Sequence, residues 1–170
     1  MSWDISIINF SKDYKSIADI PDDEPPNPLG AQNEVHKAVL EFFPKTDWSD
    51  PTWGIFDSKY GSIEFNLGRD DPSTSLMLHV RTSNELVPLI VELCNKNNWS
   101  ALDCSSGEFL ESSEHPEQGL ENWRNYLAQI LGDYASQYAA LRQPDVALEC
   151  AFQHQGPGRP MMIPALGEVW

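Results

Sequence analysis

The chain has 170 residues, of which 41% are hydrophobic, and its formal net charge is −15 at pH 7. This length favours one domain with a buried core, and the apolar content excludes a disordered chain. The 26 acidic residues against 11 basic ones repel nucleic acid and anionic membranes and favour a cationic partner, although such a charge also serves plain solubility.

Targeting, metal and nucleotide motifs are missing from the sequence. The start, MSWDISIINF, lacks the features of a secretory signal, and no stretch reaches the roughly eighteen apolar residues of a membrane span. Cys94, Cys104 and Cys150 are widely spaced, the histidines are scattered, and there is no P-loop. We therefore expect a cytoplasmic protein without disulfides, cofactor or bound metal.

The first third of the chain predicts a strand, a loop and a helix. Residues 3–9 alternate apolar and polar side chains, as a strand does. Residues 11–30 hold four prolines and an acidic cluster, and we expect a solvated connector or an acidic lip beside a binding surface. Residues 31–43 have helical apolar spacing that Pro44 ends. We expect the following DWSDPTWG stretch to be a structured loop that leads into a short strand near residues 53–56.

The clearest β signal is a pair of alternating segments, residues 62–67 and 75–81, joined by a short turn that contains proline. Together they predict an antiparallel hairpin. Its aliphatic side chains would face the core. The polar face would carry Glu64, Asn66, His79 and Arg81, together with Met77.

The next two predicted elements are a helix and a second hairpin. Residues 84–97 have an apolar stripe, and Pro88 is tolerated there because it falls in the first turn. WSALDCSSGEFL, residues 99–110, is typical of a hairpin that turns on SSG. We expect Leu102 and Cys104 on one face with a buried thiol. A reactive Cys104 is the alternative, but the adjacent Asp103 would raise the thiol pKa.

A long amphipathic helix, residues 120–141, follows. The apolar alternation of residues 146–152 allows a strand after it, and a short helix fits almost as well. The order of elements favours an α+β fold, with a mostly antiparallel sheet and two or three helices packed on one face. We expect one domain over residues 1–142 and a C-terminal extension, residues 143–170, that packs on or near it.

Several strings within residues 27–111 resemble a family of small uncharacterised bacterial proteins. They are PLG before a helix that ends in FP, then DWSDPTWG, IEFNLG, MLHVR and WSALDCSSGEFL. The chain departs from the family pattern at Asn98, where glycine is usual, and at Ser106, where threonine is usual. The resemblance implies kinship and carries no activity. Small acidic one-domain proteins of this kind often serve as immunity proteins, which is an analogy and not a motif match.

The first candidate site is the polar face of the hairpin. In the expected register Glu64 lies near His79 or Arg81. A carboxylate beside a histidine raises its pKa and fixes its tautomer, which prepares a general base, and Arg81 could hold an anion. The alternative is a solvated sheet face with cross-strand ion pairs.

The second candidate is the DWSDPTWG loop, with Asp47, Trp48, Asp50 and Trp53. Aromatic anchors supply binding energy at protein interfaces, and acidic residues steer a basic partner. The acidic spacing is not that of an EF-hand. In the alternative interpretation the tryptophans close the core and the aspartates cap turns.

We therefore predict an acidic protein-binding protein, such as a bacterial immunity protein that neutralises a basic toxin or effector domain. The expected partner-binding residues are those of the two candidate sites: Asp47, Trp48, Asp50, Trp53, Glu64, Asn66, His79 and Arg81. A small enzyme at the Glu64, His79 and Arg81 face is one alternative, and a scaffold or regulatory subunit is another. No catalytic residue is assigned, nucleic acid and membranes are not expected partners, and the oligomeric state is left open.

Overall fold

The computed structural model describes residues 1–11 and 13–141, and the side chains of the last helix as far as residue 132. The chain divides into two compact units, residues 1–129 and 130–170. The first unit holds the sheet that the structure describes. Of the second unit the structure describes the helical residues 130–141. The predicted extension, residues 143–170, lies outside the described residues.

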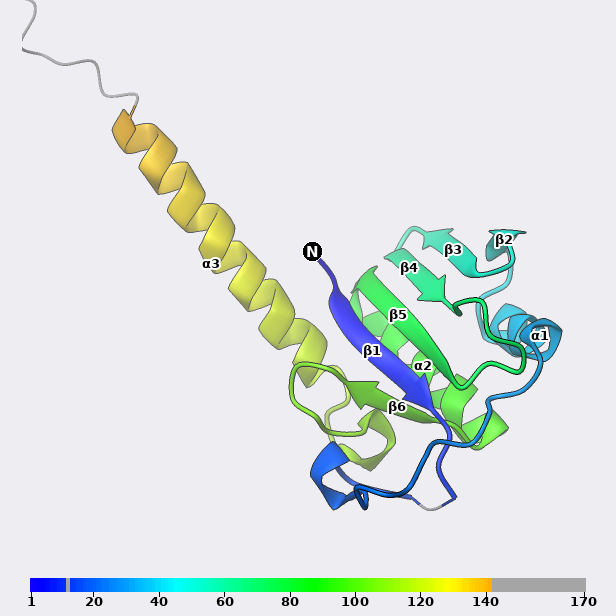
Figure 1. The fold of residues 1–170 in the computed structure, drawn as a ribbon. Helices are drawn as coiled ribbons and strands as arrows, with labels where there is room; N and C mark the ends of the chain where they lie inside the picture. Colours follow the sequence, from blue (N-terminus) through cyan, green and yellow to red (C-terminus); the bar gives the residue numbers. More distant parts are fainter. Residues whose placement is uncertain (12, 142–170) are drawn as a thin grey trace, which may run out of the picture. The chain divides into compact units, whose positions relative to one another are not determined.

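A six-stranded antiparallel sheet, with the strand order β2-β3-β4-β5-β1-β6, is the centre of the first unit (Figure 1). Together with the helices it gives the predicted α+β fold. The first strand of the chain occupies an interior position between β5 and β6. The strands are β1 (Trp3–Ile8), β2 (Asp47–Asp50), β3 (Trp53–Ser58), β4 (Gly61–Asn66), β5 (Ser75–Thr82) and β6 (Ser100–Asp103).

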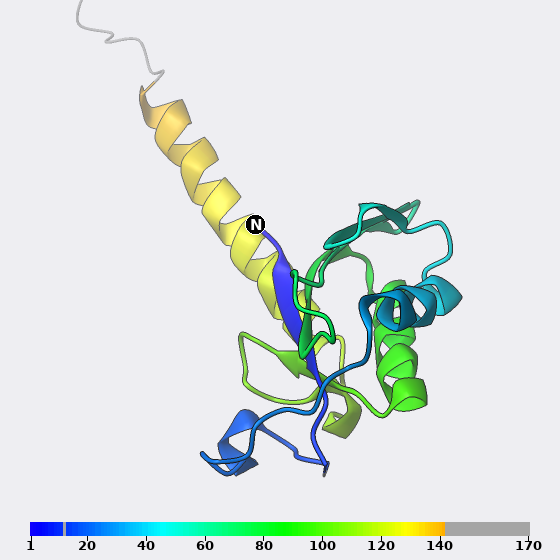
Figure 2. The same ribbon diagram turned by 45° about the vertical axis from the view of Figure 1, so that its right-hand side comes forward.

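Helices α1 (Gln32–Phe42) and α2 (Val87–Asn97) lie on the same face of the sheet (Figure 2). Pro88 falls in the first turn of α2, as predicted, where its missing N–H costs nothing. The helix ends at Asn98, whose left-handed φ of 54° is one that asparagine tolerates. A third helix, α3 (Gln118–Leu141), begins in the first unit and continues into the second.

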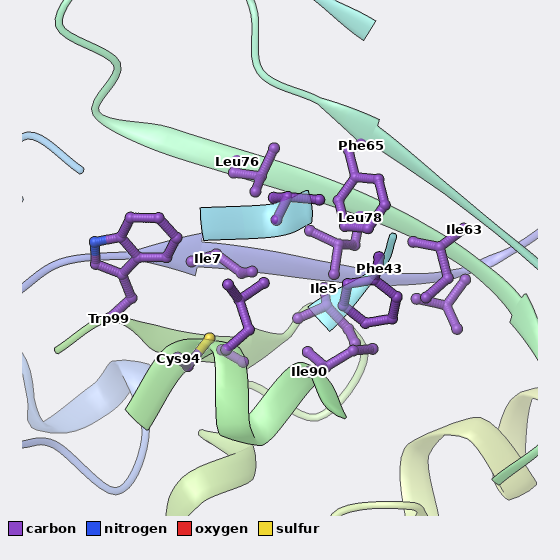
Figure 3. Close-up of a cluster of buried hydrophobic side chains, with 14 of the residues drawn as sticks. Ile5, Ile7, Phe43, Ile63, Phe65, Leu76, Leu78, Ile90, Cys94 and Trp99 are labelled. Atoms are coloured by element: carbon purple, nitrogen blue, oxygen red, sulfur yellow. The ribbon is translucent and has the colours of Figure 1, made fainter. Parts of the chain in front are cut away.

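The core lies between the sheet and helices α1 and α2 (Figure 3). Alternate residues of β1 and β5 point into it, so that Ile5 and Ile7 of β1 lie opposite Leu78 and Leu76 of β5. Phe43, at the end of α1, packs its ring 5.4 Å from that of Phe65 on β4. Because a strand alternates its side chains between faces, these same strands present polar residues on the side away from the helices.

The β4–β5 hairpin has the predicted register, with Glu64 directly opposite His79. Its buried residues alternate without a break along both strands. A slip of one residue would bring that whole apolar set out of the core. The pattern of burial therefore fixes which polar side chains are neighbours on the other face.

The prediction of a loop before β3 is wrong, because Asp47–Asp50 forms the edge strand β2. Three of its four residues are exposed, so it has no apolar alternation from which a strand could be predicted. Its pairing with β3 shifts register between Asp47 and Asp50, as a bulge does.

The expected hairpin at residues 99–110 is only partly correct. β6 forms, but residues 108–111 return through a single bridge, Leu102 to Phe109, and not as a second strand. Leu102 is buried as expected, whereas Cys104 is exposed and not part of the core. The strand ends at Asp103, so its alternation no longer applies to the thiol.

A candidate protein-binding face

The sheet face opposite α1 and α2 is called here the open face. Its side chains come from every described strand, and most are half-buried or exposed. The strand pairing arranges the central ones in two neighbouring cross-strand rows. One row is Asp47, Ile55, Glu64, His79 and Asp4. The other is Asp50, Trp53, Asn66, Met77 and Ser6.

His79 is held at the centre of the open face from two sides. Its Nδ1 donates to Oδ1 of Asp4 over 2.9 Å, and Trp53 stacks on the imidazole with ring centroids 5.7 Å apart. Burial of Asp4 raises its pKa, but hydrogen bonds from His79 and Ser2 outweigh this and hold that pKa below its usual value. The carboxylate therefore stays charged and fixes the ring orientation of His79.

Glu64 lies opposite His79 but forms its ion pair with Arg81. The Nη1 of Arg81 donates to Oε1 of Glu64 over 2.7 Å, and the Nε donates to the backbone carbonyl of Met1. The expected neighbourhood of Glu64, His79 and Arg81 is thus present. Its pairs are Asp4 with His79 and Glu64 with Arg81.

Asp47 and Asp50 lie at the edge of the open face, and each carboxylate is bonded to its own turn. Oδ1 of Asp47 accepts from the backbone and hydroxyl of Ser49, and Oδ1 of Asp50 accepts from those of Thr52. These hydrogen bonds lower the pKa of both carboxyls. The two aspartates are therefore turn caps that keep a full negative charge at the surface.

Trp48 is the one predicted site residue that lies on the other side of the sheet. Its ring stacks on His36 of α1 with centroids 4.0 Å apart and also contacts Phe65. Gly54 makes this possible, because a Cβ there would lie 2.8 Å from the indole. Trp48 closes the end of the core, whereas Trp53 is the aromatic residue that the open face presents.

A cavity of about 360 Å³ lies beside Asp4, where β1 begins. Its wall includes Ser2 and Asp4 from the start of the chain, Cys104 and Ser105 after β6, and Trp123 and Tyr126 from α3. Burial and the neighbouring carboxylates of Asp4 and Asp103 raise the pKa of the Cys104 thiol. This makes Cys104 a poor nucleophile at neutral pH.

Sequence reasoning missed Asp4, Trp123 and Tyr126. Asp4 is on the polar side of the alternating first strand, and that was its only signal. Its pairing with His79 depends on strand β1 meeting β5, which joins residues 75 positions apart. Trp123 belongs to the apolar stripe of the long helix, whereas Tyr126 lies outside that stripe, and nothing local indicates which strand either residue approaches.

Comparison with known protein families, curated proteins and solved structures finds no match for this chain. Among the described residues no three histidine, cysteine or acidic side chains come together as a metal site. Within the same part of the chain, no helix has both the length and the apolar content needed to cross a membrane. The chemistry of the open face is therefore the basis for a functional proposal.

Proposed function

We propose that this chain is an acidic protein-binding protein whose open face docks on a basic partner protein. The observation that carries the proposal is the composition of that face. Apolar Trp53, Ile55 and Met77 lie among carboxylates, and Arg81 is already paired with Glu64. The carboxylates of the face are those of Asp4, Asp47, Asp50, Asp57 and Glu64.

Apolar anchors and charges have separate roles in such docking. Ile55 is 43% exposed although its strand, β3, lies between two others in the sheet. Burial of Ile55 by a partner would add binding energy. The surrounding carboxylates, within a chain of net charge −15, would attract a basic surface and speed association. An immunity protein that neutralises a basic toxin is the specific form of this function that we favour.

The test places a photo-crosslinking amino acid at position 55 and captures the partner from a lysate of the organism that encodes the chain. The captured protein is then purified and its affinity for the unmodified chain is measured. Ile55→Ser and Trp53→Ala should weaken binding at least tenfold, and raising the salt concentration should weaken it further. The matched control is Leu40→Ser, because Leu40 is 38% exposed on α1.

Equal loss of affinity from Leu40→Ser, or a partner with an acidic surface, would contradict the proposal. The immunity form has its own test, since co-expression of the chain should relieve growth inhibition by the captured protein. If a chain with both Ile55→Ser and Trp53→Ala still relieves growth inhibition, neutralisation depends on a different surface.

The second candidate function, a small enzyme, rests on the Asp4–His79 pair. A carboxylate that accepts the Nδ1 proton of a histidine leaves Nε2 as a base, and Nε2 of His79 has no hydrogen-bond partner among the described residues. His79→Gln separates the two functions. A binding protein should keep the affinity of its partner within a few fold, whereas a general base should lose all turnover.

A further inference from the structure

The Asp4 cavity has a different character from the rest of the open face. Its wall joins three separate parts of the first unit, and its volume of about 360 Å³ falls within the range of roughly 300–1,000 Å³ that is usual for ligand sites. A pocket of this size at the end of a docking face accepts a single protruding side chain.

The charged group of the cavity is the carboxylate of Asp4. Ser2 and His79 both donate to its Oδ1, and no described residue bonds to Oδ2. None of the side chains that line the cavity is basic. The cavity therefore holds a negative charge with one oxygen available to a donor from outside.

The part of the wall that α3 contributes is mainly aromatic. Trp123 and Tyr126 are three residues apart on α3, and side chains at this spacing lie on the same side of a helix. Tyr126 is 57% exposed, so it is accessible to a ligand from solvent. Indole and phenol faces attract cations, and a guanidinium group can also stack flat on them.

The aromatic wall is fixed to the sheet before any ligand binds. The Nη2 of Arg124 donates to the carbonyl of Thr82 over 2.7 Å, and Asn84 donates to Glu121 over 2.8 Å. These bonds hold the first turns of α3 at the end of β5. A preformed site loses less entropy on binding than one that must be ordered first.

We propose that the Asp4 cavity binds the guanidinium group of an arginine side chain from the basic partner, between Asp4 and the rings of Trp123 and Tyr126. This inference rests on the proposed function, since it specifies which chemical group of the partner enters the cavity. Arginine fits better than lysine, because its planar group can pair with a carboxylate and stack on an aromatic ring at once.

The test uses the isolated full chain and needs no partner. N-acetyl-arginine methylamide is titrated into ¹⁵N-labelled protein at low salt, and the indole N–H signal of Trp123 is followed by NMR. The signal should shift saturably. The citrulline analogue has nearly the same shape but no charge, and its affinity should be at least tenfold lower.

Variants separate the cavity from general charge attraction. Asp4→Asn and Tyr126→Ala should each lower the affinity for the arginine compound at least fivefold. Glu92→Gln removes an exposed carboxylate of α2 and should leave binding unchanged. Tyr126→Ala keeps the test valid should Asp4→Asn disturb β1, because Tyr126 is largely exposed.

Three results of the titration would overturn the inference. They are equal affinity for the citrulline analogue, signal shifts at the indole of Trp53 in place of Trp123, and a loss of affinity from Glu92→Gln equal to that from Asp4→Asn. Failure of the proposed function is distinguishable, because that function is measured with the captured partner. If Trp53→Ala and Ile55→Ser weaken binding of the partner but Tyr126→Ala does not, the cavity proposal alone is refuted. If the arginine compound binds saturably but the affinity of the partner is unchanged by Trp53→Ala and Ile55→Ser, the docking-face proposal alone is refuted.

Discussion

At the scale of single residues, Glu111 is the clearest case of a carboxyl group whose burial disfavours its charged form. Oε1 accepts the backbone N–H of Ala101, whereas Oε2 is buried without a partner among the described residues. Burial raises the pKa of Glu111 above its usual 4.5. The ionised form is thus less stable in the folded protein than in water, so Glu111 contributes stability below pH 4.5 that is lost as the pH rises through the raised pKa.

Glu111→Gln should therefore raise the free energy of unfolding at pH 7 and give little or no gain at pH 4. The amide keeps the bond to Ala101 and removes the charge. Urea unfolding at the two pH values measures the effect. Glu114→Gln, at an exposed position, is the control. A larger gain at pH 4 than at pH 7 would show that burial of the charge is not the cause.

The two described cysteines should react differently in the native protein. Cys94 is buried, and burial followed by the nearby Glu111 carboxylate raises its thiol pKa well above 9. Cys104 is exposed, with a pKa that is also raised. Iodoacetamide at pH 8, followed by mass mapping, should modify Cys104 slowly and Cys94 only after denaturation. Rapid labelling of Cys104 would restore the reactive-thiol hypothesis.

At the scale of elements, the start of α3 is fixed by the close approach of Gly119 to β1 and β6. A Cβ at Gly119 would lie 2.0 Å from Oδ2 of Asp103 and 2.8 Å from Nε1 of Trp3. Gly119→Ala should cost about 1–3 kcal/mol of stability, the usual cost of overpacking. Thermal unfolding measures this. Gly132→Ala is the matched control in the same helix, since a Cβ there would meet no atom of the described residues within 4 Å beyond its chain neighbours and its own helix backbone. This substitution should stabilise by up to about 1 kcal/mol.

The elements that the sequence predicts correctly are those with one buried face. β1, β4 and β5 alternate apolar and polar residues, and α1 and α2 carry apolar stripes, so local pattern alone is sufficient. β2 has no buried face, and its only large apolar side chain, Trp48, packs against His36 of α1. An edge strand of this kind is defined by its partner β3 and not by its own residues.

The candidate site follows the same rule. The neighbourhood of Glu64 and His79 was predictable, because a short turn sets the register of β4 against β5. Asp4 and the aromatic pair of α3 were not, since they meet through contacts between segments that are distant in the sequence. Trp48 and Trp53 look equivalent in DWSDPTWG, but the register shift in β2 and the pairing of β3 put them on opposite faces.

At the scale of the whole molecule, the net charge of −15 acts on stability as well as on recognition. Mutual repulsion of carboxylates weakens the folded state, and salt screens it over a Debye length of about 10 Å at 0.1 M. Raising sodium chloride from 10 to 300 mM should therefore increase the melting temperature. A fall would mean that attractive pairs, such as Glu64 with Arg81, outweigh the repulsion.

The interior position of β1 also has a consequence for synthesis on the ribosome. β1 is made first, yet its two neighbours in the sheet, β5 and β6, begin at Ser75 and Ser100. Pairings of such long sequence separation form slowly, because a large loop must close before any contact is gained. The nascent chain must therefore carry an unpaired first strand until Thr82, the end of β5, has emerged, and the other edge of β1 stays unpaired until Asp103 has emerged. A nascent chain stalled before Thr82 exposes a hydrophobic strand to which chaperones can bind.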